Sequence, residues 1–272
     1  MLDGGPGHLI TNGEDPFLFV GALLRDADAT VGNLECAIVS TGHAVDKPYT
    51  FRGPTTALPL LRQYFSGVSL ANNHSADWGR QGFVSELNLL KSADVAWFGG
   101  GRDLAQARSP LILERNGIRL ALLGYNEFPP HSFAATTGSA GTAWLVESEV
   151  IKDIRAARLT KQADIVIPYL HWGHEFDEVP DAQQQALARR LIDAGADAVV
   201  GSHPHVTQTV DWHNGHPIIY ILGNFVFDYY PGDPKVWKGW IIRLTFEPPA
   251  SPKLEIFPVT LDAAGVPRLV DS

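Results

Sequence analysis

The chain has 272 residues, 45% of them hydrophobic, so it can bury one large core, and its formal net charge at pH 7 is −9. The acidic balance and the absence of runs of Lys or Arg argue against nucleic acid and anionic membrane surfaces as partners. Cys36 is the single cysteine, so no disulfide can form within the chain. No apolar run approaches the roughly 20 residues that span a bilayer. We expect one domain over residues 1–272.

The N-terminal stretch is unusual. It lacks the basic region and apolar core of a signal peptide, so the chain as given is expected to be soluble. Asp3-Gly4-Gly5-Pro6-Gly7 predicts a loop, because glycine and proline disfavour the interiors of helices and strands. We therefore expect residues 1–13 to form a loop in which a truncated chain begins.

Strands and helices are predicted to alternate up to about residue 200, and only strands follow, which indicates an α/β protein. Apolar spacing predicts helices over residues 17–25, 55–64, 81–93, 149–160 and 181–194. Strands are predicted over residues 27–34, 67–71, 95–98, 111–114, 118–124, 165–170, 198–200, 206–212, 217–222, 239–246 and 253–259. Asn116-Gly117 and Asn214-Gly215 predict hairpins. Pro168 lacks a backbone donor and predicts an edge strand or a bulge. The loop over residues 128–141 is expected to form a mobile rim over the site.

Candidate metal-binding and catalytic side chains follow the first two predicted strands. Glu35 stands at the C-terminal end of the first strand, as a metal ligand or as an exposed loop acid. The second strand runs into Asn72, Asn73 and His74. There an amide oxygen can bind a metal and the imidazole can reach a substrate oxygen. Asn-rich turns are ordinary, but a turn needs no histidine, which favours a functional role.

Histidines follow two later strands. His171 and Glu175 come where the strand over residues 165–170 ends. Gly201-Ser202-His203-Pro204-His205 follows the strand over residues 198–200. Open α/β sheets bind ligands at the carboxyl ends of their strands, and neutral imidazole is the commonest metal ligand. The alternative is a polar surface loop that happens to hold two histidines.

The strand ends are expected to converge on one edge of a sheet, bringing together Glu35, Asn73 with His74, His171 with Glu175, and His203 with His205. Nitrogen and oxygen ligands without thiolates suit Mn²⁺, Fe²⁺ or Zn²⁺ better than Ca²⁺. Such a set can hold two ions about 3.5–4 Å apart, bridged by one carboxylate. The ions would lower the pKa of a water molecule and bind phosphate or carboxylate oxygens. No Gly-x-Ser-x-Gly elbow is present, which argues against a serine hydrolase.

Five motifs resemble, in order along nearly the whole chain, those of bacterial poly-γ-glutamate capsule-biosynthesis proteins of CapA/PgsA type. They are Gly32-Asn33-Leu34-Glu35, Leu70-Ala71-Asn72-Asn73-His74-Ser75-Ala76-Asp77, His171-Trp172-Gly173-His174-Glu175, Gly201-Ser202-His203-Pro204-His205-Val206 and Gly223-Asn224-Phe225-Val226-Phe227-Asp228. This family is similar to a branch of the calcineurin-like metallophosphoesterase superfamily. The resemblance thus implies a four-layered α/β/β/α sandwich, here lacking its first strand.

The resemblance also implies roles for residues. Two divalent metal ions would be ligated by Glu35, Asn73, His171, His203 and His205. His74 would be the catalytic acid at the leaving oxygen. Substrate contacts are expected from Asn72, Arg52, Glu175 and Asn224.

One family feature has no counterpart. The superfamily opens on Asp-x-His, and the capsule family opens on Gly-Asp followed by an apolar residue and often Met. This chain begins at that Met. We expect residues encoded upstream to form a strand ending in Gly-Asp, where a signal or anchor segment can also lie.

The sequence therefore predicts a metal-dependent hydrolase of phosphoesterase type, associated with a poly-γ-glutamate capsule or another cell-envelope polymer. Its substrate would be an anionic polymer or a phosphoester. The alternative is a non-catalytic component of a capsule-synthesis complex, which binds metal and holds an acidic polymer through Lys47 and Arg52. The residues do not predict a compartment, although the family is often associated with the cell envelope.

Overall fold

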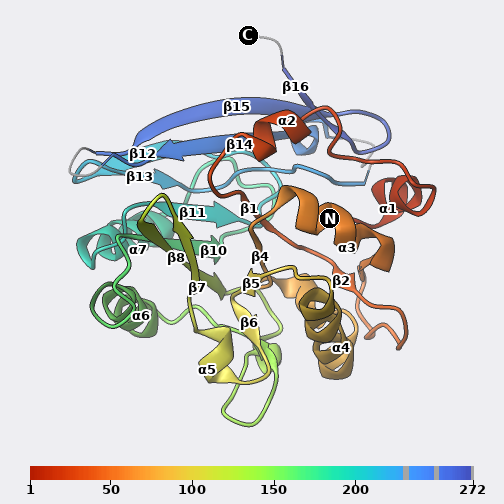
Figure 1. The fold of residues 1–272 in the computed structure, drawn as a ribbon, viewed down its shortest axis with the longest axis horizontal. Helices are drawn as coiled ribbons and strands as arrows, with labels where there is room; N and C mark the ends of the chain where they lie inside the picture. The colour runs from red at the N-terminus through yellow and green to blue at the C-terminus, as the bar shows by residue number, and fades with distance from the viewer. Residues whose placement is uncertain (229–232, 248–250, 271–272) are drawn as a thin grey trace.

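The computed structural model describes residues 1–228, 233–247 and 251–270. Two β-sheets face each other across an apolar core, and each sheet carries helices on its outer side (Figure 1). The layers are therefore helix, sheet, sheet and helix. This arrangement confirms the α/β class and the four-layered sandwich expected from the sequence.

The smaller of the two facing sheets has three parallel strands in the order β1-β4-β5. They are β1 (Val31–Asn33), β4 (Gly67–Ser69) and β5 (Trp97–Phe98). Two helices cover its outer side, α3 (Leu58–Tyr64) and α4 (Gly79–Ser92). Leu61 of α3 and Phe83 and Leu87 of α4 are buried there, which anchors both helices on the sheet.

The larger sheet has six strands in the order β12-β13-β11-β10-β8-β7. Its members are β7 (Leu111–Arg115), β8 (Ile118–Asn126), β10 (Ile165–His171), β11 (Val199–Ser202), β12 (Val210–His213) and β13 (His216–Ile219). The four central strands are parallel, and each edge strand joins its neighbour in an antiparallel hairpin. Helices α6 (Glu147–Leu159) and α7 (Ala182–Asp193) pack on the outer face.

Shorter elements surround the sandwich. An antiparallel sheet of β14 (Lys238–Thr245), β15 (Lys253–Leu261) and β16 (Pro267–Leu269) lies across one end, at the top of Figure 1. Two strand pairs are β2 (Ala37–Ile38) with β3 (Arg52–Gly53), and β6 (Gly100–Gly101) with β9 (Gly141–Thr142). The other helices are α1 (Gly4–Thr11), α2 (Gly21–Arg25) and α5 (Leu104–Ala107). The 3₁₀ turns are Thr55–Ala57, Asn73–Ala76, His131–Phe133 and Pro234–Trp237.

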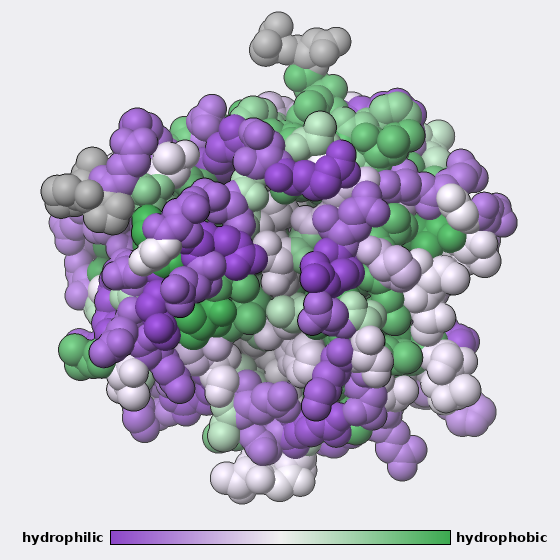
Figure 2. Space-filling view, in the orientation of Figure 1, coloured by the Kyte–Doolittle hydropathy of each residue, from purple (hydrophilic) through white to green (hydrophobic). Residues whose placement is uncertain are grey.

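The surface in this view is mixed in character. Figure 2 shows polar side chains over much of this face, with apolar side chains visible between them near the middle of the molecule. None of the helices in the described ranges is long and apolar enough to cross a membrane.

The loop predicted for residues 1–13 is wrong, because α1 occupies Gly4–Thr11. A side-chain oxygen of Asp3 caps this helix by accepting the Gly4 N–H at 2.8 Å. Pro6 stands in the first turn, where a backbone N–H would have no partner within the helix, so proline costs little there. Whether this segment forms a helix therefore depends on where its glycines and proline stand, and not on how many there are. The strand predicted before Met1 concerns residues outside this sequence and stays a prediction.

The edge position predicted from Pro168 is also wrong. Strand β10 lies between β8 and β11 in the middle of the larger sheet. Val166 donates its N–H to the carboxylate of Asp197, and its carbonyl accepts the Asp197 N–H. The backbone groups of Val166, and of every second residue along β10, therefore point toward β11. Pro168 shares that direction, and β10 pairs with β11 only from Tyr169 onward. The missing donor therefore falls where the ladder has not yet begun.

Most other predicted elements are confirmed within a few residues, including both hairpins. The helix predicted over residues 17–25 is α-helical only from Gly21.

Glu86 is a buried acid in α4 that forms no ion pair with any residue in the described part of the chain. The Oε1 atom of Glu86 accepts a hydrogen bond from the Ile38 N–H at 2.8 Å, which ties α4 to β2. Burial raises the pKa of Glu86 from 4.5 to about 8, and the nearby Asp77 carboxylate also raises it. Because the native state holds this proton more tightly than the unfolded state, native stability falls as pH rises from about 4.5 to about 8.

Replacing Glu86 with Gln should remove this pH dependence while keeping an acceptor for the Ile38 N–H. We expect the stability of Glu86→Gln relative to the wild type to rise between about pH 5 and pH 8, by at most about 1.4 kcal/mol per pH unit, and then to level off. Urea unfolding at several pH values measures this difference. The exposed Glu114→Gln is the control, and a pH-independent difference for Glu86→Gln would contradict the prediction.

Candidate metal centre

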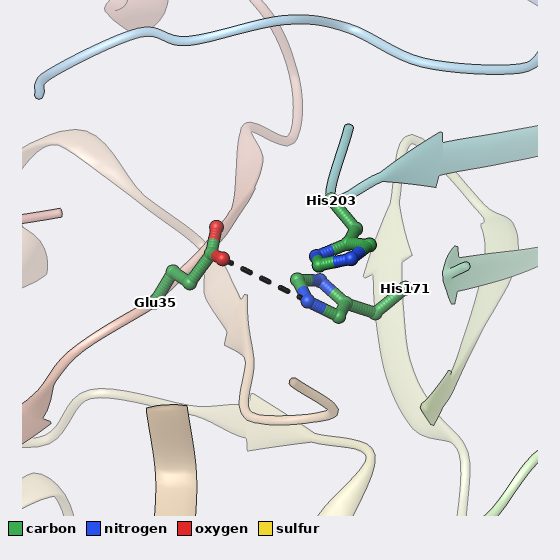
Figure 3. Close-up of side chains that lie close together, drawn as sticks. All are labelled: Glu35, His171 and His203. Carbon is green, nitrogen blue, oxygen red and sulfur yellow. Dashed lines mark ion pairs between the residues drawn. The ribbon is translucent and has the colours of Figure 1, made fainter. Parts of the chain in front are cut away.

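The carboxyl ends of three parallel strands bring the predicted ligands together. Strand β10 ends on His171, which lies beside Ser202 at the end of β11. His203 follows β11 directly, and Glu35 follows β1 on the facing sheet. Figure 3 shows Glu35 on one side and the rings of His171 and His203 on the other, with all three side chains turned toward one another. Residues far apart in the chain thus meet at one edge of the sandwich.

The distances within the cluster match those between ligands of a shared cation. The Oε1 atom of Glu35 is 3.7 Å from Nε2 of His171 and 4.0 Å from Nε2 of His205. Nε2 of His171 is also 2.8 Å from Oδ1 of Asn73. Two donors that each bind one ion at about 2.1 Å lie at most about 4.2 Å apart. The structure therefore brings Glu35, Asn73, His171 and His205 together, and His203 lies beside them.

Several polar atoms of the cluster are buried without a partner. Within the described ranges, Oε1 of Glu35 and both ring nitrogens of His203 make no hydrogen bond. Burying such atoms unpaired costs free energy, so native proteins normally satisfy them. A cation would accept their lone pairs, and the mixed carboxylate, amide and imidazole donors suit a divalent transition metal. The residues present therefore fit a metal ion.

Burial keeps the two central imidazoles neutral, which is the form that binds metal. Burial holds the pKa of His171 well below its usual value, and the neighbouring histidines act in the same direction. Burial lowers the pKa of His203 to about 3, again reinforced by nearby histidines.

Neighbouring polar groups orient the candidate ligands. Nδ1 of His171 lies 3.1 Å from Oγ of Ser202. Nδ1 of His205 lies 2.9 Å from Oδ1 of Asn224, whose Nδ2 donates to the carbonyl of Val236 at 2.8 Å. Asn224 therefore presents an acceptor to His205, so His205 carries its proton on Nδ1 and keeps a lone pair on Nε2, the atom that faces Glu35.

The loop that carries two of the histidines has a strained backbone. His203 has φ of 114° and His205 has φ of 61°, both in the left-handed region that side chains other than glycine rarely adopt. The ring of Phe128 packs 4.0 Å from the ring of His203, centroid to centroid. Strain of this kind persists where packing imposes it and often accompanies functional sites.

His74 is held by a buried carboxylate. Its Nδ1 lies 2.9 Å from Oδ2 of Asp77, which also accepts the Phe51 N–H at 2.6 Å. Lys47 forms an ion pair with the other oxygen of Asp77. These contacts fix the imidazole, and its Nε2 has no hydrogen-bond partner among the described residues.

Three residues that orient the site received no predicted role. Asp77 holds His74, Ser202 contacts His171, and Nδ2 of Asn33 donates to Oε2 of Glu35 at 3.1 Å. The spacing of Asp77 three residues after His74, within one short turn, was the available signal for the first. Asn33 stands two residues before Glu35 in the same segment, so its spacing was also an available signal. The contact of Ser202 with His171 joins separate strands and is recognised only from their packing.

The residues predicted to bind substrate have varied surroundings. Asn72 caps the turn after β4 and donates to Asn33 and to the carbonyl of Leu34. The guanidinium of Arg52 donates to the carbonyls of Val39 and Ser40 and lies over the ring of Trp78. Glu175 is exposed beside the cluster, and Asn224 contacts His205. Their roles toward a substrate stay predictions.

A cavity of about 560 Å³ opens next to the cluster. Glu35, His203 and His205 are among its lining residues, and much of its wall is apolar, including Val31 of β1 and Leu244 of β14.

Comparison with known proteins places the chain. Residues 1–229 match the family model described as bacterial capsule synthesis protein PGA_cap. The chain belongs to this family. It is 30% identical over 263 residues to the capsule biosynthesis protein CapA of Bacillus anthracis, and 31% identical over 261 residues to the PGA biosynthesis protein CapA of Bacillus subtilis. Each alignment covers 94% of this chain, but only 63% and 68% of those relatives.

Solved structures share the fold. The NAD nucleotidase NadN of Haemophilus influenzae matches 80% of this chain and 41% of its own, with 12% identity and a TM-score of 0.50. The sulfate thiohydrolase SoxB of Thermus thermophilus matches 98% and 42%, with 15% identity and a TM-score of 0.51. The fold is that of the calcineurin-like metallophosphoesterases, as the resemblance implied.

The close packing behind His203 predicts a sensitive position. A Cβ added at Gly201 would overlap the carbonyl oxygen of Tyr220 and the indole nitrogen of Trp172. We expect Gly201→Ala to lower the free energy of unfolding by about 1–3 kcal/mol or more, as overpacking does. Gly138→Ala is the matched control, because a Cβ there meets nothing within 4 Å. Thermal unfolding of both variants measures the effect, and equal losses would refute this account of Gly201.

Proposed function

We propose that this chain is the catalytic part of a metal-dependent phosphoesterase-type hydrolase that acts on a poly-γ-glutamate capsule or a related cell-envelope polymer. One observation carries the proposal. The buried and unpartnered Oε1 of Glu35 faces the Nε2 atoms of two histidines, His171 and His205, on different strand ends. With a carboxylate placed between the imidazole nitrogens of two strand ends, Glu35 would serve both positions of a two-ion site.

The residues divide between two adjacent positions. Asn73, His171 and His203 would hold one ion, His205 would bind the other, and Glu35 would be shared. When bound, two divalent ions stabilise charge on phosphoryl oxygens and make a water molecule more acidic. The metal identity is left open between Mn²⁺, Fe²⁺ and Zn²⁺.

His74 is proposed as the general acid. Asp77 engages Nδ1 of its ring, so Nε2 is the atom that can exchange a proton with a leaving oxygen. Lys47 balances the charge of Asp77, and the carbonyl of Asn73 accepts a hydrogen bond from Lys47 at 3.3 Å. The cationic loop is thereby tied to the turn that carries both Asn73 and His74.

The net charge of the chain and the names of its relatives support the proposed class of substrate. The chain has a formal net charge of −9, so an anionic substrate needs a local positive centre, which bound cations would supply. Relatives are named for capsule and PGA biosynthesis, and one from Mycobacterium tuberculosis, 33% identical over 214 residues, is named a probable polyglutamine synthesis accessory protein. A phosphoester or an anionic polymer is therefore proposed as the substrate.

The names of these relatives also support a second candidate. "Biosynthesis" and "accessory" describe assembly rather than hydrolysis. In that case the same cluster would hold metal without turnover, as part of a capsule-synthesis complex that binds an acidic polymer. The structure uses Lys47 and Arg52 in internal contacts, so the metal cluster would carry most of the attraction in this candidate.

Three alanine variants separate binding from catalysis. We expect His171→Ala and His203→Ala to lose bound metal, measured by elemental analysis after dialysis against Mn²⁺. We expect His74→Ala to keep its metal but to hydrolyse bis-p-nitrophenyl phosphate roughly 10²–10⁴-fold more slowly, the usual range for a general acid. His213→Ala is the control, since His213 pairs with Asp193 on the surface.

The possible outcomes are distinct. Metal without turnover in the wild type favours the binding candidate. Loss of metal in His74→Ala equal to that in His203→Ala would make His74 a ligand and overturn its proposed role.

A further inference from the structure

A second group of potential ligands adjoins the first. Glu175, His203 and His205 each offer a donor atom, and these atoms lie within 4.8 Å of one another. Glu35, His171 and His203 form the other group by the same measure. Both groups contain His203, so the two positions are neighbours.

The loop after β10 holds Glu175 against the histidine loop. The N–H of Phe176 donates to the carbonyl of Pro204 at 2.9 Å, which joins the two loops by their backbones. The ring of Phe176 lies 6.4 Å from that of His205, centroid to centroid. Phe176 itself has φ of 66°, a conformation that packing must impose. Glu175 is thus positioned by its neighbour rather than free on a long loop.

His203 supplies an independent sign of a ligand. The residue is 2% exposed, and neither ring nitrogen has a hydrogen-bond partner among the described residues. A neutral buried imidazole has one N–H and one lone pair to satisfy, and here the protein meets neither. The atoms of Glu175 and His205 lie near this unsatisfied ring.

We propose that Glu175 completes the second cation position together with His205, beside the His203 ring that borders both positions, and that Glu35 is shared between the two positions. This inference rests on the proposed metal-dependent function and assigns Glu175 a ligand's role in place of the predicted substrate contact.

The two positions differ in their surroundings. Asn73 and His171 are buried, whereas Glu175 is exposed. The position at Glu175 therefore binds its cation more weakly and exchanges it faster than the position at His171. Removing the negative charge of Glu175 should weaken that position alone, because the number of charged ligands tunes cation affinity.

The experiment is a titration of the full chain. Protein stripped with a chelator is titrated with Mn²⁺ by calorimetry, and bound metal is counted by elemental analysis. We expect two equivalents in the wild type, one tight and one weak. Glu175→Gln and His205→Ala should each lose the weak equivalent, or weaken it at least about tenfold, while the tight equivalent persists. Glu178→Gln is the control, because this exposed acid is ion-paired with Lys235.

Each outcome decides something. Two equivalents of unchanged affinity in Glu175→Gln overturn the inference. A single tight equivalent in the wild type also overturns it and leaves the metal centre at His171 intact. Absence of any bound Mn²⁺ in the wild type refutes the proposed function itself.

Discussion

The site depends on buried polar atoms that the protein brings together, of which Oε1 of Glu35 and both ring nitrogens of His203 have no hydrogen-bond partner among the described residues. Glu35, His171, His203 and His205 turn acceptor atoms toward one region, and burial keeps His171 and His203 neutral. Each unpaired buried acceptor costs free energy comparable to a lost hydrogen bond. A divalent cation would remove this cost for several atoms at once, which fits the gathering of acceptors rather than hydrophobic side chains here.

The rest of the fold serves to hold those acceptors in place. Parallel pairing of β10 with β11 sets His171 beside Ser202, and the facing sheet delivers Glu35 across the interface. The small residue Gly201 lets β11 approach Tyr220 and Trp172 closely, so the strained loop that carries His203 starts from a fixed point. Orientation within a few tenths of an ångström matters for metal ligation, and strands provide it better than free loops.

Two buried carboxyl groups near the site, those of Asp77 and Glu86, differ in their hydrogen-bond and ion-pair partners. Asp77 has a lysine, a backbone N–H and an imidazole as partners, and it orients His74. Glu86 has one backbone N–H, and burial raises its pKa to about 8. The first therefore holds the imidazole of His74, whereas the second links α4 to β2 as a largely neutral acid.

The sequence by itself determined the alternation of strands and helices, both hairpins, and the chemical residues at the strand ends, because these depend on local spacing and turn chemistry. It did not determine that Gly4–Thr11 forms a helix or that Pro168 lies in a central strand. Both outcomes depend on whether the backbone groups of these segments need partners from other segments. Tertiary structure alone decided the partners of the site residues. His171 meets Asn73 although 98 residues separate them, and Arg52 turns to the carbonyls of Val39 and Ser40. Such pairings arise when sheets pack, and no local pattern encodes them.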